Sequence, residues 1–273
     1  MDNKPTVFDY KGPRMNQGPI QGAQVVGRIA ALLRIVSRKP EGSPLMDVVR
    51  ESGLTRPTVH RLLTSLAAEG LLDHDGGTGN WVLGPEALLL GSVAAARFPV
   101  EDIARPSLRR LAEETGESAF FSVRRGSETV CLMREEGAFP IRSFVLHEGV
   151  RFPLGIASAG IAIMSFLPAT EQEQLLARWD EHAGTFASTQ SPALVREKLA
   201  QTSAVGYSVN PGLVLEGSWG MGAAVFDTHG KPAWALSLTG IEPRFREERQ
   251  EFLGRLLLEE AHQITGRLQN GMS

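Results

Sequence analysis

The first part of the chain places its apolar residues at the spacing of an amphipathic helix. Over residues 24–38 they fall at i, i+3, i+4 and i+7, which predicts a helix with one buried face: Val26, Ile29, Ala30 and Leu33. Pro40 and Gly42 follow and end the helix. The chain therefore begins its folded part with a helix of three to four turns.

Two more helices are predicted on either side of Gly53. The second is short, with Ser43 as its N-cap, Pro44 at its first position and a stripe formed by Leu45, Val48 and Val49. The third follows an N-cap at Thr55 and carries Pro57 in its first turn, where no hydrogen bond is lost. Its apolar stripe repeats the helical spacing: Val59, Leu62, Leu63 and Leu66.

Polar side chains gather beside or opposite that stripe, near the start of the third helix. Gly70 ends the helix, and two short strands follow at 71–74 and 80–83, joined by the glycine-rich turn 75–79. This is the layout of a winged helix-turn-helix, whose second helix enters the major groove of DNA with its N-terminus first. A plain helical subdomain would share the helix spacing, and the wing favours the DNA-binding interpretation. The candidate DNA contacts are Ser43, Thr55, Arg56, Pro57, Thr58, His60 and Arg61.

The rest of the chain changes pattern twice. Residues 85–97 are apolar on nearly every side, which predicts a helix buried in its own head or packed on a second copy. From residue 98 helices alternate with strands, as in an α+β or α/β ligand-binding domain. Expected helices are 100–115, 157–166, 171–178, 192–203 and 246–269. Expected strands are 118–125, 128–135, 140–146, 219–227 and 232–239.

Composition and charge narrow the class of protein. The chain has 273 residues, 42% hydrophobic and 22% charged, which suits two globular domains, and no apolar run is long enough to span a membrane. Residues 1–84 hold 10 Lys and Arg against 8 Asp and Glu, and residues 85–273 hold 18 against 23. The head is thus +2 and the body −5, so only the head favours nucleic acid. The single cysteine, Cys131, excludes an intrachain disulfide and a cysteine-based zinc cluster.

The stretch GLTRPTVHRLLTSLAAEGLLDHD, followed by NWVLGPEALLLG, resembles the head of the IclR family of regulators. The resemblance extends over nearly the whole chain. It implies a winged helix-turn-helix domain (23–84), a dimerising linker helix (85–97) and a GAF-like effector domain (98–273), preceded by residues 1–22, whose polar, Pro- and Gly-rich composition predicts a flexible arm. The resemblance also implies a homodimer or tetramer that binds double-stranded operator DNA and a small-molecule effector, without a cofactor. The composition and the lone cysteine predict a cytoplasmic protein. The polar effector contacts implied are Ser158, Ala159, Asn210, Gly220, Ser237 and Thr239, and the walls are Ile141, Phe144, Phe152 and Ser218.

The residues themselves leave these effector contacts open. The small residues 155–160 lead from a strand end into a helix start, which suits either a carboxylate or close packing of the helix on the sheet. Ser237 and Thr239 alternate on one strand and share a face, where a ligand or cross-strand partners could satisfy their hydroxyls. Gly155 and Ile161 stand where the family commonly has His and Lys. Asn210 and the Pro-Gly after it replace an acidic cluster, which favours a less polar, aromatic or bulkier ligand.

Two other classes of protein compete with a regulator. An enzyme would use Ser158 or Ser237, yet no base is positioned beside either, and the six histidines have no metal-binding spacing. Cys131 lies among apolar residues of a strand and is predicted to be an inert core thiol. A metabolite-binding module without DNA binding is the second alternative. The predicted function remains an effector-controlled transcription regulator, acting as a repressor or an activator, with no catalytic or metal site.

Overall fold

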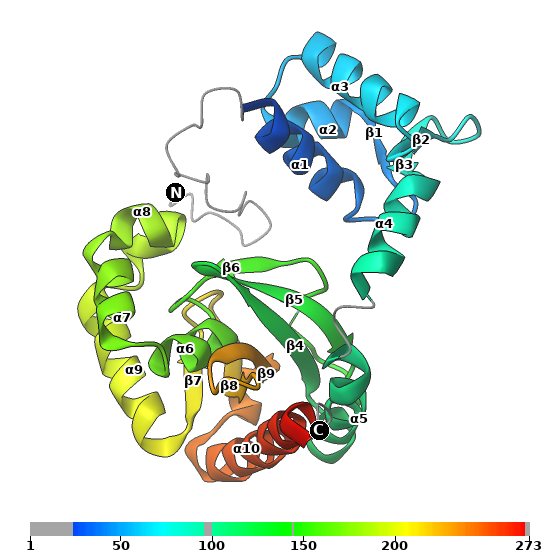
Figure 1. Ribbon diagram of the computed structural model, residues 1–273. Helices are drawn as coiled ribbons and strands as arrows, with labels where there is room; N and C mark the ends of the chain where they lie inside the picture. Colours follow the sequence, from blue (N-terminus) through cyan, green and yellow to red (C-terminus); the bar gives the residue numbers. More distant parts are fainter. Residues whose placement is uncertain (1–23, 96–99, 144, 271–273) are drawn as a thin grey trace. The chain divides into compact units, whose positions relative to one another are not determined.

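The computed structural model describes residues 24–95, 100–143 and 145–270. These residues form two compact units, one on either side of residues 96–99, and each is treated by itself (Figure 1). The predicted arm, residues 1–22, lies outside the described residues, as do the last residues of the predicted linker helix.

The N-terminal unit has three helices, a small sheet and a further helix. Its elements are α1 (Gln24–Val36), β1 (Ser43–Pro44), α2 (Leu45–Ser52), α3 (Arg56–Ala68), β2 (Leu72–His74), β3 (Asn80–Leu83) and α4 (Pro85–Ala95). The three strands are antiparallel in the order β1-β3-β2. The predicted stripes form one core, with Leu32, Val48, Val59 and Leu63 fully buried against Trp81 of β3.

Two details at the start of the helices correct or extend the sequence prediction. Ser43 is not the N-cap of α2: it pairs with Trp81 in β1, and Pro44 takes the cap position without a side-chain hydrogen bond. A third sheet strand therefore outweighed the capping preference at this position. Thr55 is the N-cap residue of α3, but its hydroxyl lies 2.9 Å from that of Thr58 instead of bonding a backbone N–H. Gly53 takes the left-handed conformation expected after α2, with φ 67°.

The C-terminal unit is a six-stranded antiparallel sheet with helices on both faces. It begins with α5 (Val100–Thr115), β4 (Ser118–Arg125), β5 (Glu128–Glu135), β6 (Arg151–Pro153) and α6 (Ser158–Ser165). It continues with α7 (Ala169–Ala177), α8 (Trp179–Ala183), the 3-10 turn η2 (Gly184–Ser188) and α9 (Pro192–Val205). The last elements are β7 (Tyr207–Pro211), β8 (Ser218–Phe226), β9 (Pro232–Ile241), the 3-10 turn η3 (Glu242–Arg244) and α10 (Glu247–Asn270).

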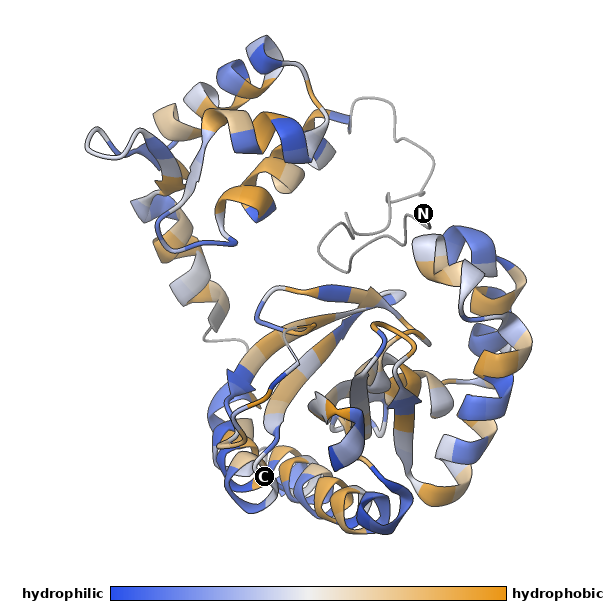
Figure 2. Cartoon of the chain, turned by 180° about the vertical axis from the view of Figure 1, so that it is seen from behind, coloured by the Kyte–Doolittle hydropathy of each residue, from blue (hydrophilic) through white to orange (hydrophobic). Residues whose placement is uncertain are grey.

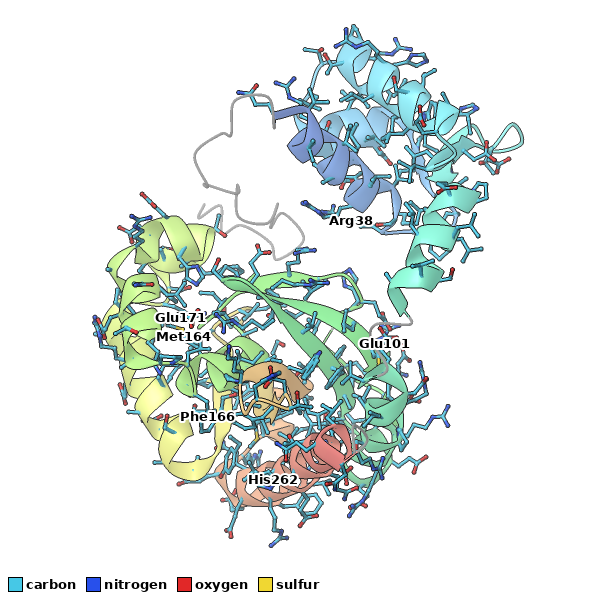
Figure 3. The ribbon with its side chains drawn as sticks, viewed as in Figure 1. Arg38, Glu101, Met164, Phe166, Glu171 and His262 are labelled. Carbon is cyan, nitrogen blue, oxygen red and sulfur yellow. The ribbon has the colours of Figure 1, made fainter. Side chains whose placement is uncertain are left out.

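The strand order β6-β5-β4-β9-β8-β7 brings the first and last strands of the domain together at β4 and β9. Helices α5 and α10 pack together on one face, and α6 lies on the other with α9 behind it (Figure 1). The strands are mostly apolar, in contrast to the outer faces of the helices (Figure 2). Met164 of α6 is fully buried (Figure 3) in a core that also holds Leu176, Trp179 and Leu199 from α7, α8 and α9.

The strand predicted at 140–146 is absent, and its described residues form an irregular segment. Strand β5 pairs with β4 on one edge and, through Glu128, Thr129 and Val130, with the short β6 on the other, and the sequence prediction missed β6. Ile141 is consequently 58% exposed, whereas Val145 and Leu146 turn inward. The edge strand β7 was also missed. The other predicted helices and strands of this unit agree with the structure to within two residues at each end.

Candidate functional site

Helix α3 presents a cationic surface at its N-terminal half. Arg56, His60 and Arg61 are exposed, and among the described residues neither guanidinium forms an ion pair. Pro57 and Thr55 are exposed beside them, and Thr58 is half-buried. Ser43, in contrast, is only 4% exposed, so it does not share this surface. Six of the seven predicted DNA contacts thus lie together at the start of α3.

Trp81 joins this helix to the wing. Its ring is 6% exposed and meets the rings of His74 on β2 and His60 on α3 edge-on, with centroids 4.9 Å and 6.5 Å away. The turn beyond is ordered by Asp75, whose carboxylate accepts hydrogen bonds from the Thr78 hydroxyl and the Gly77 N–H. These bonds lower the pKa of Asp75. No Lys or Arg occurs between Gly70 and Gly84, so the positive charge comes from α3.

A pocket in the C-terminal unit lies between the sheet and the start of α6. Strands β4, β5, β8 and β9 contribute its floor, and the segments before β6 and after β7 contribute its walls. Eight of the ten predicted effector contacts line it: Phe152, Ser158, Ala159, Asn210, Ser218, Gly220, Ser237 and Thr239.

Two predicted wall residues do not join them. Ile141 is exposed and is not among the lining residues, because its segment is not a strand. Phe144 lies outside the described residues. Val145 and Leu146, from the same segment, do line the pocket.

The hydroxyls of Ser237 and Thr239 point into this pocket and have no hydrogen-bond partner among the described residues. Ser237 is fully buried, and both oxygens are shielded from solvent. The sequence left open whether cross-strand partners would satisfy them, and within the described structure none does. A buried hydroxyl without a partner costs on the order of 1–3 kcal/mol. A ligand that bonds both hydroxyls would remove that cost.

The start of α6 faces the same hydroxyls. Ser158 and Ala159 line the pocket within the first turn, where backbone N–H groups have no partner inside the helix. Close packing is also real: a Cβ added at Gly220 would lie 3.0 Å from the Ser158 Oγ, and one at Gly222 would lie 3.1 Å from the Ser158 carbonyl. The small residues therefore let α6 approach the sheet, and that approach brings its N-terminus to the pocket.

Other polar residues of the lining are already engaged. The Asn210 amide donates to the Ile156 carbonyl at 2.6 Å and accepts from the Leu213 N–H at 3.1 Å. The Ser218 hydroxyl lies 2.6 Å from that of Ser143. These side chains shape the wall and tie the loop after β7 to the start of α6.

Several lining residues were not predicted as effector contacts, among them Ser122, Thr129 and Cys131. A period-2 pattern could have found them, because alternate residues of β4 and β5 share the face that carries Ser237. Burial raises the pKa of the Cys131 thiol to about 12, with a further rise from Glu148, which keeps the thiol neutral. Among the described residues no group of His, Cys, Asp and Glu is arranged to hold a metal ion.

A winged helix-turn-helix unit and a separate unit with a buried pocket define a ligand-responsive DNA-binding regulator. Residues 25–76 match the IclR helix-turn-helix domain, and residues 93–266 match the bacterial transcriptional regulator IclR C-terminal domain. The chain therefore belongs to the IclR family of bacterial transcriptional regulators. No described helix is long and apolar enough to cross a membrane.

Relatives of known name agree with this family. The chain is 28% identical to the transcriptional repressor IclR of Escherichia coli over 255 residues, covering 93% of each chain. It is 29% identical to the regulator BhcR of Paracoccus denitrificans, covering 93% of this chain and 92% of that one. An IclR homologue of Microbacterium hydrocarbonoxydans, solved with 4-hydroxybenzoate, shares the fold with a TM-score of 0.72 at 20% identity, covering 90% of this chain and all of that one.

Proposed function

We propose that the chain is a homodimeric repressor or activator that binds a pseudo-palindromic operator through α3 and responds to an organic acid. The observation that carries the DNA interface is the pair of exposed guanidiniums, Arg56 and Arg61, at the start of α3. A guanidinium can bond guanine O6 and N7 together or grip a phosphate. Thr58 and His60 are neighbouring contacts. Ser43 is left out because it is buried.

The dimer is supported by α4. Four large apolar side chains of this short helix are exposed in the single chain, at 56–74%: Leu88, Leu89, Leu90 and Val93. Exposed apolar side chains in such number on one helix mark an interaction surface. Packing against α4 of a second copy would bury these side chains. It would also hold two DNA-binding units at the spacing of two half-sites about one DNA turn apart. A protein that binds operator DNA in this way would act in the cytoplasm.

The effector proposal rests on the unpartnered hydroxyls of Ser237 and Thr239 facing the start of α6. Hydroxyl donors and free backbone N–H groups at a helix N-terminus together suit a carboxylate. Binding would shift the population of head arrangements, and a coupling free energy on the order of 1–3 kcal/mol would suffice. The Microbacterium homologue's 4-hydroxybenzoate is an acid of the proposed class.

We infer binding without turnover. The described pocket lining contains no His, Asp, Glu, Lys or Arg, so no general base or acid adjoins Ser158 or Ser237. An effector recovered unchanged after long incubation with the protein would support a sensor. Its conversion to a product would favour the enzyme alternative.

The first test is the capture of genomic DNA fragments by the purified protein at two salt concentrations. Arg61→Ala should weaken binding to the enriched sites by about 1–3 kcal/mol if Arg61 reads a base, and reduce the salt dependence if it contacts a phosphate. The control is Arg255→Ala, which removes an exposed arginine from α10 in the other unit and should leave DNA binding unchanged. Equal affinity of the Arg61 variant and wild type would remove Arg61 from the interface. Enrichment of no site would contradict the regulator itself.

A further inference from the structure

The pocket has two chemically different ends. At one end, the polar end, Ser237 and Thr239 of β9 face the first turn of α6. At the other, the apolar end, Cys131 of β5 lies with Phe152 of β6 and with Val150, whose carbonyl accepts a hydrogen bond from the Cys131 N–H at 2.9 Å. A ligand that fills the pocket must match both ends.

Strand order sets the distance between these ends. Strand β4 lies between β5 and β9, and Ser122 of β4 pairs with Cys131 on one side and Ala235 on the other. Two strand spacings separate β5 from β9, which is about 10 Å. A ligand anchored at the polar end therefore reaches the apolar end with a body the size of an aromatic ring or a short carbon chain.

The apolar end offers no partner for a charge. None of the described lining residues is a Lys, Arg or His, and the Thr129 hydroxyl is directed at the Phe152 carbonyl. The Cys131 thiol is neutral, and the two charges that act on it, Glu148 and more weakly Arg134, have opposite signs and lie 3.8 Å apart, where they pair with each other. A carboxylate placed here would lose its hydration without gaining a cation.

The side wall does not supply a replacement. Both polar atoms of the Asn210 amide are engaged by the backbone of Ile156 and Leu213. The Ser218 hydroxyl is engaged by Ser143. A second acidic group on the ligand would thus meet engaged dipoles at Asn210 and Ser218 and apolar atoms at the far end.

We propose that the effector is a monocarboxylic acid with an uncharged body, its acid group at the polar end and its body extending across β4 to Cys131, Val150 and Phe152. This inference rests on the proposed function, in which the effector is an organic acid. It adds a selection rule: the pocket accepts one carboxylate and rejects a second one at the opposite end.

Isothermal titration of the full chain with two matched pairs of acids tests this rule. 4-Methylbenzoate and terephthalate have nearly the same shape, as do crotonate and fumarate, and each pair differs by one carboxylate at the far end. We expect at least one monoacid to bind, with affinity at least about tenfold above that of its diacid, because the second charge is buried unpaired. Equal or tighter binding of the diacids, or no binding by any of the four, would overturn the inference.

A charge introduced at the apolar end should change the selection. Val150→Lys should move the affinity ratio toward terephthalate by about tenfold, because an ammonium would pair with the second carboxylate. Val150→Met has a side chain of similar length without charge and should keep the wild-type preference. A ratio that moves equally in both variants would contradict the placement of the body at Val150. The wild-type measurement stands even if a variant does not fold.

The DNA capture experiment separates this inference from the proposed function. If 4-methylbenzoate binds in preference to terephthalate but leaves the captured DNA unchanged, the selection rule holds and effector control fails. If terephthalate alone binds and changes DNA capture, effector control holds and the selection rule fails.

Discussion

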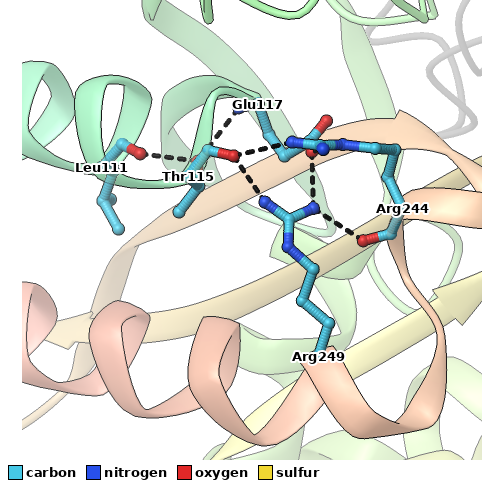
Figure 4. A network of polar contacts seen from close by, with 5 residues as sticks. All are labelled: Leu111, Thr115, Glu117, Arg244 and Arg249. Atoms are coloured by element: carbon cyan, nitrogen blue, oxygen red, sulfur yellow. Dashed lines mark hydrogen bonds and ion pairs between the residues drawn. The ribbon is translucent and has the colours of Figure 1, made fainter.

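Polar side chains lie on both faces of strand β9, and the two groups differ in whether their hydrogen-bonding capacity is used. On the α6 face, the hydroxyls of Ser237 and Thr239 have no hydrogen-bond partner among the described residues. On the other face, the carboxylate of Glu117 lies over Gly240 and accepts hydrogen bonds from Arg244 Nε and Arg249 Nη1, both at 2.7 Å (Figure 4). The face with Ser237 and Thr239 thus has unpaired polar atoms, whereas the face with Glu117, Arg244 and Arg249, called here the closed site, has its charges paired with one another.

The closed site connects distant parts of the chain. The guanidiniums of Arg244 and Arg249 also donate to the Thr115 carbonyl at the end of α5, and Arg244 lies over the ring of Phe139 at 4.3 Å. Glu117 is buried, whereas the two arginine side chains are 27–29% exposed. Charges that satisfy one another in this way hold α5, β9 and α10 in place and leave no capacity for a ligand. The pocket differs because two of its hydroxyls, those of Ser237 and Thr239, have no hydrogen-bond partner among the described residues.

The largest effect is expected at the closed site. Glu117→Gln keeps the shape of the side chain but leaves two guanidiniums beside a neutral amide, so the free energy of unfolding should fall by about 3 kcal/mol. Urea unfolding followed by tryptophan fluorescence would measure it. Glu173→Gln is the matched control: its ion pair with Arg196 is exposed and screened by solvent, so its loss should leave the free energy of unfolding nearly unchanged. Equal losses in the two variants would show that burial of Glu117 confers no special role.

Lys198 of α9 is a buried charge without the partners that Glu117 has. Its side chain is 7% exposed, its Nζ has no hydrogen-bond partner among the described residues, and burial lowers its pKa to about 8, against a smaller opposing effect of Glu197. Between pH 8 and 10.5 the unfolded chain holds this proton more tightly than the folded one. Stability should therefore rise with pH across that window and be lowest, with respect to this group, below pH 8.

Lys198→Met should consequently stabilise the protein at pH 7 by about 2 kcal/mol and remove this part of the pH dependence. Lys231→Met, at an exposed turn, should change neither quantity. Urea midpoints of the three proteins at pH 7.5 and 9.5 would measure the difference, since other groups titrate equally in all of them. A destabilised Lys198 variant with unchanged pH dependence would show that the ammonium reaches solvent.

The two faces of β9 were not equally accessible to sequence analysis. Alternation along the strand correctly placed Ser237 and Thr239 on one face, because the period of a strand is local. It could not show that their hydroxyls lack partners, which depends on β4, β8 and α6 packed around them. The Glu117 network was missed altogether, since Glu117 and Arg249 are 132 positions apart and meet only through the pairing of β4 with β9.

The same limit explains the errors around the pocket. The apolar pattern at 140–146 predicted a strand, but the strand that pairs with the outer edge of β5 is β6, and a local pattern does not show which segment pairs there. Ile141 was therefore expected in the wall and lies exposed. Cys131, in contrast, lies in the core as predicted, and the sequence did not show that it also borders the pocket. In the head, by contrast, helix stripes and the wing are local features, and only the roles of Ser43, Pro44 and Thr55 at the helix starts changed.

The smallest expected effect compares two fully buried serines of the sheet. Ser237→Ala removes a hydroxyl without a partner, so the free energy of unfolding should rise by about 1 kcal/mol while binding of 4-methylbenzoate weakens about tenfold. Ser208→Ala removes a hydroxyl that donates to the Ser158 carbonyl at 2.7 Å, so the free energy of unfolding should fall by about 1 kcal/mol. Urea unfolding without ligand and titration with 4-methylbenzoate would measure both quantities. A loss of stability in both variants would mean that Ser237 is satisfied in the free protein, and its hydroxyl would then have no unused capacity for a ligand.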